Sequence, residues 1–429
     1  MNILFASSEV APFIKTGGLA DVAGSLPKAL AQAGHDVKVI LPLYEGIGGE
    51  WRSQMTFVKY FNVTLSWRQV YCGIFSLERD GVTYWFVDNE YYFKRWQLYG
   101  HFDDCERFAY FSRAVIETPG QLDYWPDVIH CNDWQTALVP IYLLEDKYRI
   151  AQLNRAKSVF TIHNIQYQGR YGDQVLEDVI GLDKSYFNEG MLAYHDDVNL
   201  MKGAIMASNF VTTVSPTYAY ELTIPFYAHG MDGVINQQRG KVQGILNGID
   251  MDLYDPANGK GLAEAFTADK VDEGKKACKL ALQKAVGLQE NPDVPIIACI
   301  SRLVGHKGFS LVTDVLHQIM DMNVQMVVLG TGDWQFEEAF RNAQGQYPGR
   351  FAAQITYSAP HVHHDLRRRG YLPDALRQRA LRPVPDDRHA LRHGAHRPGD
   401  RRPEGHRVPL QQVHRYRPGL HLRGYQRQR

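Results

Sequence analysis

The sequence predicts an α/β protein with two parallel-sheet domains. Apolar runs of strand length alternate with helix-like stretches over residues 1–245, and the same alternation restarts after residue 293. With 429 residues, 45% of them hydrophobic, the chain is long enough to bury more than one core. Two glycines, Gly17 and Gly18, join the first apolar run to the first helical stretch, as at a strand-to-helix turn.

The stretch Lys15–Leu19 predicts an anion site. It follows the apolar run Met1–Ala6 and precedes a helix. The glycines let the backbone approach a ligand, the amides of a first helical turn favour an anion, and Lys15 adds a mobile positive charge. A pyrophosphate fits these features, and the alternative is an ordinary turn with a solvated lysine. The dinucleotide and P-loop fingerprints do not occur, which disfavours a nicotinamide oxidoreductase.

Six strands are expected in the first half of the chain: Ile3–Phe5, Asp36–Leu41, Tyr84–Val87, Val128–His130, Val159–His163 and Phe210–Val214. The helix after the glycines should end at Gly34, and Pro27 within it predicts a kink or an early end. Its apolar stripe consists of Leu19, Val22, Leu26 and Leu30. Residues 60–100, rich in Tyr and Trp, predict short antiparallel strands and an exposed loop, with rings that fill the core or stack on sugars.

The second half repeats the α/β pattern. A polar connection, 256–292, contains a helical stretch at Lys275–Val286. Beyond it we expect strands at Ile296–Ile300, Val324–Leu329 and Phe351–Tyr357. The helices between them are expected at Phe309–Met320 and Trp334–Ala343.

The last 71 residues differ from the rest in composition. Residues 359–429 contain 17 Arg and 6 Asp or Glu, and they lack Lys, Ile, Met, Phe, Trp, Cys, Asn, Ser and Thr. Such bias signals disorder. A sharper interpretation is translation in a shifted frame, because codons for 365–375 can encode I-Y-A-G-A-D-I-F-L-M-P in the neighbouring frame. Codons for 378–392 can likewise hide S-E-P-C-G-L-S-Q-M-I-A-M-R-Y.

The predicted domains follow from these observations. A first domain spans 1–250, a connection spans 251–292, a partial second domain spans 293–358, and an Arg- and His-rich frameshift tail spans 359–429. The tail could attract acidic surfaces by charge, but we expect no specific nucleic-acid partner.

Composition also bears on the compartment. The cysteines are odd in number and scattered without metal-ligand spacing: Cys72, Cys105, Cys131, Cys278 and Cys299. No secretion signal precedes the first strand, and no apolar run approaches membrane-spanning length. We expect a cytoplasmic protein without a membrane anchor, metal site or cofactor.

Seven motifs occur in order along the chain. The first two are S-S-E-V-A-P-F-I-K-T-G-G-L-A-D-V (7–22) and D-V-I-H-C-N-D-W-Q-T-A-L (127–138). The others are F-T-I-H-N-I-Q-Y-Q-G (160–169), T-V-S-P-T-Y-A-Y-E (213–221), G-I-L-N-G-I-D (244–250), S-R-L (301–303) with Lys307-Gly308, and L-G-T-G-D (329–333). Together they resemble the motifs of the bacterial glycogen synthases and plant starch synthases, and the resemblance covers residues 1 to about 358. The hidden peptide E-P-C-G-L-S-Q also matches this family's donor segment.

This resemblance implies the GT-B fold, in which two Rossmann-like domains face each other across a cleft, here with the second domain incomplete. It implies retaining transfer of glucose from ADP-glucose to the non-reducing end of an α-1,4-glucan such as glycogen. Two alternatives stay open: a non-catalytic glucan-binding protein and a related glucosyltransferase that uses UDP-glucose.

The reaction places negative charge on departing ADP, so cations around the pyrophosphate stabilise its transition state. Lys15 with the amides of Gly17 and Gly18 can serve from the first domain. Arg302 and Lys307 can serve from the second, and for both the alternative is a solvated loop cation.

Other roles follow from the resemblance. The histidine matching His163 holds the donor glucose through a hydroxyl and its backbone carbonyl, although a lone histidine is more often structural. Asp133 shapes the acceptor side or orients groups in the cleft, and its alternative is a helix N-cap. The other matched positions are Glu9, Asp21, Asn164 and Asn247, with Tyr357 placed to stack near the adenine or to fill the core.

One family feature is missing. The family supplies a donor-side glutamate from E-P-C-G-L, where this chain has Arg379–Arg382. No pair of carboxylates is identifiable that could replace it in the way a glycosidase uses one carboxyl group as general acid and another as base or nucleophile. We therefore expect this chain to be impaired.

Overall fold

The computed structural model describes residues 1–146, 149–259 and 261–356, apart from the side chain of His306. Tyr357, the end of the strand predicted at Phe351–Tyr357, and the tail at 359–429 lie outside the described residues.

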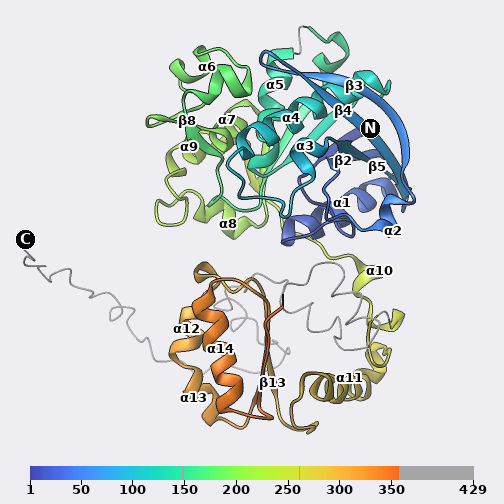
Figure 1. Ribbon diagram of the computed structural model, residues 1–429, viewed down its shortest axis with the longest axis vertical. Helices are drawn as coiled ribbons and strands as arrows, with labels where there is room; N and C mark the ends of the chain where they lie inside the picture. Colours follow the sequence, from blue (N-terminus) through green and yellow to red (C-terminus); the bar gives the residue numbers. More distant parts are fainter. Residues whose placement is uncertain (147–148, 260, 357–429) are drawn as a thin grey trace, which may run out of the picture. The chain divides into compact units, whose positions relative to one another are not determined.

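A nine-stranded sheet dominates the first half of the chain (Figure 1), in the order β12-β11-β7-β6-β1-β2-β5-β4-β3. Neighbours from β12 to β5 pair in parallel, which confirms the predicted parallel sheet. These parallel strands are β1 (Asn2–Ala6), β2 (Asp36–Pro42), β5 (Val82–Asp88), β6 (Val128–Asn132), β7 (Lys157–Ile162), β11 (Phe210–Thr213) and β12 (Val242–Gly244).

The antiparallel part is longer than expected. β3 (Thr56–Leu65) and β4 (Arg68–Arg79) form an antiparallel ribbon that continues from β5, so the prediction of short strands is wrong. Both alternatives for the aromatics occur, because Tyr84 is buried in the core whereas Trp67 is 73% exposed.

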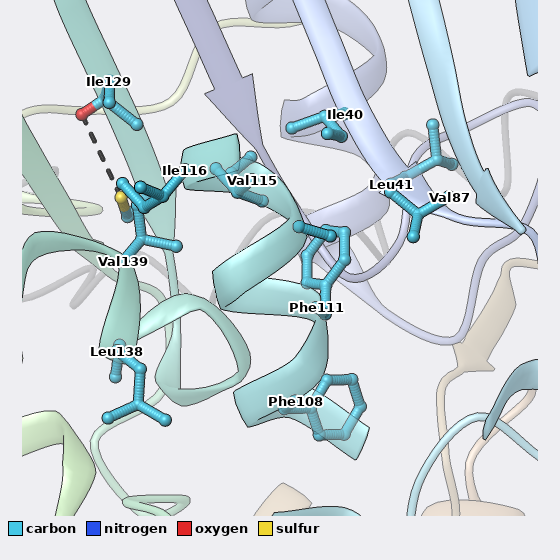
Figure 2. Packing of buried hydrophobic residues seen from close by; sticks show 14 of the residues in the cluster. Ile40, Leu41, Val87, Phe108, Phe111, Val115, Ile116, Ile129, Leu138 and Val139 are labelled. Atoms are coloured by element: carbon cyan, nitrogen blue, oxygen red, sulfur yellow. Dashed lines mark hydrogen bonds between the residues drawn. The ribbon is translucent and has the colours of Figure 1, made fainter. Parts of the chain in front are cut away.

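One core lies under this sheet, and α4 (Asp104–Gln121) runs through it. Figure 2 shows Phe111 of α4 on the side of the helix towards Leu41 of β2 and Val87 of β5, with Phe108 about one turn away along the helix. Thirteen of the helix's residues are buried, so other elements enclose α4 around most of its circumference. The buried set includes polar side chains, and Arg107 is paired with Asp104. The neighbouring helix α5 (Leu138–Asp146) packs against α4.

Helix α1 (Gly18–Gln32) follows β1 and corrects one prediction. It contains Pro27 and continues for five residues beyond it, so the early end is wrong. Pro27 itself is buried. Leu26 and Leu30 of the predicted stripe pack against the core. Leu19 is buried outside that cluster, and Val22 is half-buried.

The remaining elements of this half are short. A separate three-stranded sheet has the order β8-β10-β9, formed by Arg170–Gly172, Asp197–Asn199 and Ala193–Tyr194. The α-helices are α2 (Gly49–Arg52), α3 (Glu90–Phe93), α6 (Ser185–Asn188), α7 (Leu200–Ala207), α8 (Pro216–Glu221), α9 (Asp232–Gln237) and α10 (Met251–Tyr254). Single turns of other helix types are η1 (Trp134–Thr136), η2 (Ala151–Arg155), η3 (Leu176–Ile180), η4 (Arg239–Lys241) and η5 (Pro256–Asn258).

A second parallel sheet has the order β13-β14-β15. Its strands are β13 (Ile296–Ile300), β14 (Gln325–Leu329) and β15 (Phe351–Gln354). β14 is buried along its whole length, whereas each residue of β13 is only half-buried. The chain reaches this sheet through η6 (Ala268–Lys270) and α11 (Val271–Val286).

The helices of this second unit follow the predictions with one correction. The helix expected at Phe309–Met320 divides into α12 (Phe309–Asp314) and α13 (Leu316–Asp321). α14 (Trp334–Gln346) is three residues longer than expected. A single turn, η7 (Gly305–Lys307), precedes α12. The small core gathers Phe309, Phe336 and Phe340 from these helices. The predicted domain bounds at 250, 292 and 358 stay predictions.

Candidate functional site

The carboxyl ends of β1, β6 and β7 lie side by side in the large sheet. The strand order reverses at β1, since β2 continues the sheet on one side and β6 on the other. Open α/β sheets bind ligands at such a switch point, beyond the carboxyl ends of their strands. The loops that start there carry Glu9, Asp133 and His163.

Glu9 organises the loop after β1. Its carboxylate accepts hydrogen bonds from the Gly17 amide at 3.2 Å, from the Thr16 amide, and from the Thr16 hydroxyl at 3.0 Å. The Tyr99 hydroxyl donates a further bond at 3.1 Å, and Glu9 is only 4% exposed. The carboxylate of Glu9 is therefore the anion that the Gly17 amide holds.

Lys15 is fixed, contrary to the expectation of a mobile charge. Its Nζ lies 2.5 Å from a carboxylate oxygen of Asp21, in the first turn of α1. Gly18 is exposed at the N-terminus of the same helix. The structure thus brings Lys15, Gly17, Gly18 and Asp21 together around one helix end, where the amides carry partial positive charge.

Asp133 follows β6 with φ 56° and ψ −179°, a backbone region that non-glycine residues rarely adopt. Its carboxylate accepts hydrogen bonds from the backbone amides of His163 at 2.8 Å and Asn164 at 3.2 Å. Asp133 does occupy the N-cap position of η1, but its side chain makes no cap hydrogen bond there. Burial raises the pKa of Asp133 to about 7, against the opposing effect of the two amides.

His163 follows β7, and its ring contacts the neighbouring strand. Nε2 lies 2.9 Å from Oδ1 of Asn132, the last residue of β6. Burial, and secondarily the nearby His130, lower the pKa of His163 to about 3. The ring is therefore neutral at physiological pH, and it can bind a hydroxyl without bringing a charge of its own.

Arg302 and Lys307 lie on the second unit, after β13. Both are exposed. Although Lys307 is exposed as a residue, its ammonium group is partly buried, and this burial, followed by the charge of Arg302, lowers the pKa of Lys307. The two cations are therefore close enough to interact. The turn after β14 packs against the backbone on either side of Arg302, because a Cβ on Gly330 would lie 1.9 Å from the Ser301 carbonyl oxygen and one on Gly332 would lie 2.2 Å from that of Leu303. The backbones of two motifs that are separate in the sequence thus lie side by side.

Asn247 is exposed in the segment between β12 and α10. The structure gives it no contact with the Glu9–Asp133–His163 group. Further along the same segment, Lys28 of α1 reaches Asp252 at 2.6 Å and Asp250 at 3.7 Å. This double ion pair ties α1 to the start of α10.

A pocket of about 450 Å³ opens beside the site. Trp134, next to Asp133, forms one wall, and Tyr167, Arg170, Tyr171 and His229 line the rest. Aromatic faces combined with polar groups suit a ligand with apolar faces and hydroxyl edges, such as a sugar.

Two functional side chains escaped the sequence analysis. Asn132 is fully buried at the end of an apolar strand. A polar residue at the end of the apolar run in D-V-I-H-C-N-D-W was the sequence signal that could have identified it. Tyr99 reaches Glu9 from a loop 90 residues away, and no local pattern could have revealed that contact. Within the described residues, no group of three or more His, Cys, Asp or Glu could hold a metal ion. None of the helices described has the length and apolarity needed to cross a membrane.

Comparison with known proteins adds a family. Residues 2–237 match the family described as the starch synthase catalytic domain. A glycogen synthase from Geobacillus thermodenitrificans is 48% identical over 364 residues, or 85% of this chain and 75% of that protein. A glycogen synthase from Ligilactobacillus salivarius is 46% identical over 359 residues, which are 83% of this chain and 75% of that protein. The catalytic domain of starch synthase IV from Arabidopsis thaliana, solved with ADP and acarbose, matches with TM-score 0.76 and 34% identity over 84% of this chain and 75% of that one.

Proposed function

This chain belongs to the starch synthase catalytic-domain family of glycosyltransferases, and from that membership we propose that it is built to transfer glucose from ADP-glucose to an α-1,4-glucan. The acceptor is the non-reducing end of glycogen, and the anomeric configuration is retained. We place the reaction in the cytoplasm, and no cofactor or metal takes part in it.

The observation that carries this proposal is the convergence of Glu9, Asp133 and His163 at the switch point of the large sheet. Each of them falls in a motif shared with glycogen synthases. The similar starch synthase IV domain was solved with a nucleotide and an oligosaccharide analogue, which supports ADP and a glucan as the ligands here.

The proposed chemistry assigns each group a charge or a hydrogen bond. Cleavage of the bond between the sugar and the phosphate leaves negative charge on ADP, and Lys15, Arg302 and Lys307 are the cations that stabilise it. The exposed amide of Gly18 adds a neutral donor at the helix end. His163 binds the glucose, and Asp133 fixes the backbone that carries it.

The acceptor chain is assigned to the pocket beside Trp134. Its aromatic walls can stack on glucose rings, and Arg170 and His229 can bind their hydroxyl groups. Asn164 lies between this pocket and His163 in the sequence, with its amide held by Asp133. Asn247 and Tyr357 are retained as binding residues on the resemblance alone.

We also propose that the chain as written is impaired. The family's donor-side glutamate should follow β15, where the sequence is rich in arginine and where codons can be chosen so that a shifted reading frame encodes the family's segment. The matches leave about 15% of this chain and 25% of the relatives unaligned. Among the described residues β13, made only of Ile, Ala and Cys, is a half-buried edge strand.

The function is tested with a variant in which the frame is restored after codon 358. We expect it to transfer [14C]glucose to glycogen from ADP-[14C]glucose at least about tenfold faster than from UDP-[14C]glucose. A preference for UDP-[14C]glucose would favour the alternative donor. Co-sedimentation with glycogen without transfer from either donor would favour a glucan-binding protein.

A further inference from the structure

The ring of His163 is connected to a third strand through Asn132. Asn132 is fully buried, and its Nδ2 donates a hydrogen bond of 3.0 Å to the carbonyl oxygen of Ala6, the last residue of β1. Its Oδ1 lies 2.9 Å from Nε2 of His163. One side chain therefore joins the carboxyl ends of β1, β6 and β7.

These contacts determine where the proton of the neutral ring is. A carbonyl oxygen only accepts hydrogen bonds, so the amide nitrogen of Asn132 must face Ala6. Rotating the amide by 180° would bring two acceptor oxygens together inside the protein, where an unpaired polar group is costly. Oδ1 consequently faces His163, and because Oδ1 carries no hydrogen, Nε2 must be the protonated nitrogen.

We infer that Asn132 is a positioning residue that holds His163 in its Nε2–H tautomer, so that Nδ1 is presented as an acceptor to a hydroxyl group of the transferred sugar. The tautomer follows from the geometry, whereas the sugar hydroxyl rests on the proposed function. Among the described residues, no hydrogen bond reaches Nδ1 of His163, and its backbone amide is already bound by Asp133.

Consecutive residues thus fix both parts of the histidine. Asn132 holds the ring, and Asp133, whose backbone has a positive φ, accepts the His163 amide with its carboxylate. The lowered pKa of His163, at about 3, keeps a lone pair on Nδ1 across the physiological range. A ring held in this way meets the hydroxyl without reorganising, which is the condition for effective orientation.

The test uses the 429-residue chain labelled with 15N-histidine. Long-range 1H–15N spectra distinguish protonated from unprotonated ring nitrogens, and His163→Gln identifies the signal of interest among the 17 histidines. We expect Nδ1 to be unprotonated in the wild type and both tautomers to be populated in Asn132→Leu. If Asn132→Leu fails to fold, Asn132→Ala takes its place. If neither variant folds, the protonation of Nδ1 in the wild-type spectrum tests the inference by itself.

Thr212→Val is the matched control. The hydroxyl of Thr212 forms a 2.7 Å hydrogen bond with the hydroxyl of Thr161 on the same part of the sheet, and not with His163. The tautomer of His163 in Thr212→Val should therefore match that in the wild type. A protonated Nδ1 in the wild type, or a tautomer unchanged in Asn132→Leu, would overturn the inference.

Addition of ADP-glucose to the labelled frame-restored protein, which carries the family's donor segment, tests the ligand separately. A shifted Nδ1 resonance supports the sugar hydroxyl as its partner. An unshifted resonance with Nδ1 unprotonated would contradict the proposed ligand and leave the tautomer standing, so the two failures are distinguishable.

Discussion

The carboxylate of Asp133 accepts a 2.8 Å hydrogen bond from the backbone amide of His163, 30 residues later in the chain. The contact exists because β6 and β7 are parallel neighbours, which brings the residues after them to the same edge. Asp133 keeps a backbone conformation that costs an aspartate on the order of 1–3 kcal/mol. The surrounding hydrogen bonds offset that strain, and the loop carrying His163 is held in one place.

Asp133 should give stability a measurable pH dependence. Its pKa in the folded protein is raised to about 7 from an ordinary value of 3.8. The folded state therefore binds the proton more tightly, and this contribution to stability, complete below about pH 4, is lost as the pH rises through 7. Relative to Asp133→Asn, which does not titrate, the wild type should lose up to about 4 kcal/mol of unfolding free energy over that range.

Urea unfolding of both proteins from pH 4 to pH 8 measures the difference. Groups that titrate equally in both proteins cancel. A constant difference across this range would show that Asp133 has an ordinary pKa in the folded state.

Glu9 should stabilise the loop before α1. Glu9→Gln keeps the shape of the side chain but replaces one carboxylate oxygen by an NH2 group, which cannot accept a hydrogen bond. Donors such as the Gly17 amide then lose their acceptor. We expect the unfolding free energy to fall by about 1–3 kcal/mol and the Thr16 and Gly17 amides to exchange faster with deuterium. Glu90→Gln is the control, because that side chain is 74% exposed. Equal effects of the two substitutions would contradict the role assigned to Glu9.

The sequence predicted the strands of the large sheet well because their apolar runs are short, separated and bounded by turns. It failed where tertiary contacts decide the local outcome. Pro27 does not end α1, since the helix packs on the sheet on both sides of it. The helix expected at Phe309–Met320 breaks near Val315, where no proline or glycine gives warning.

The site shows the same limit. Loop positions after strands were predictable because parallel sheets gather their carboxyl ends, and Glu9, Asp133 and His163 do meet there. The hydrogen-bond partner of each group could not be predicted. Tyr99 reaches Glu9 across 90 residues and Asn132 reaches Ala6 across 126, and single-sequence periodicity contains no information about such pairs.

Arg302 and Lys307 should bind the nucleotide. In the frame-restored protein, Arg302→Ala and Lys307→Ala should each weaken ADP binding by about 10-fold or more, because each removes a charged contact to phosphate. Arg341→Ala is the control. That guanidinium is 57% exposed and pairs with Glu337 on α14. Calorimetric titration with ADP gives the dissociation constants, and equal affinities in all three variants would remove these cations from the site.

The core around α4 should be the main source of stability in the first half. Phe111 is fully buried between the helix and the sheet (Figure 2), so Phe111→Ala should lower the unfolding free energy by about 3–5 kcal/mol. Phe102→Ala removes the same kind of ring from a position that is 94% exposed, and it should change the unfolding free energy by less than about 0.5 kcal/mol. Chemical denaturation followed by tryptophan fluorescence compares the two, and similar losses would contradict the packing described for α4.

The central claim is that a glucan synthase is encoded here with part of its donor site replaced. Incorporation of [14C]glucose from ADP-[14C]glucose into glycogen, measured side by side for the 429-residue protein and its frame-restored form, tests it most directly. We predict turnover by the restored protein and at least about 100-fold less by the 429-residue protein, because the proposed loss of the donor-side glutamate would remove stabilisation of the transition state. Equal turnover by the two proteins would contradict the account.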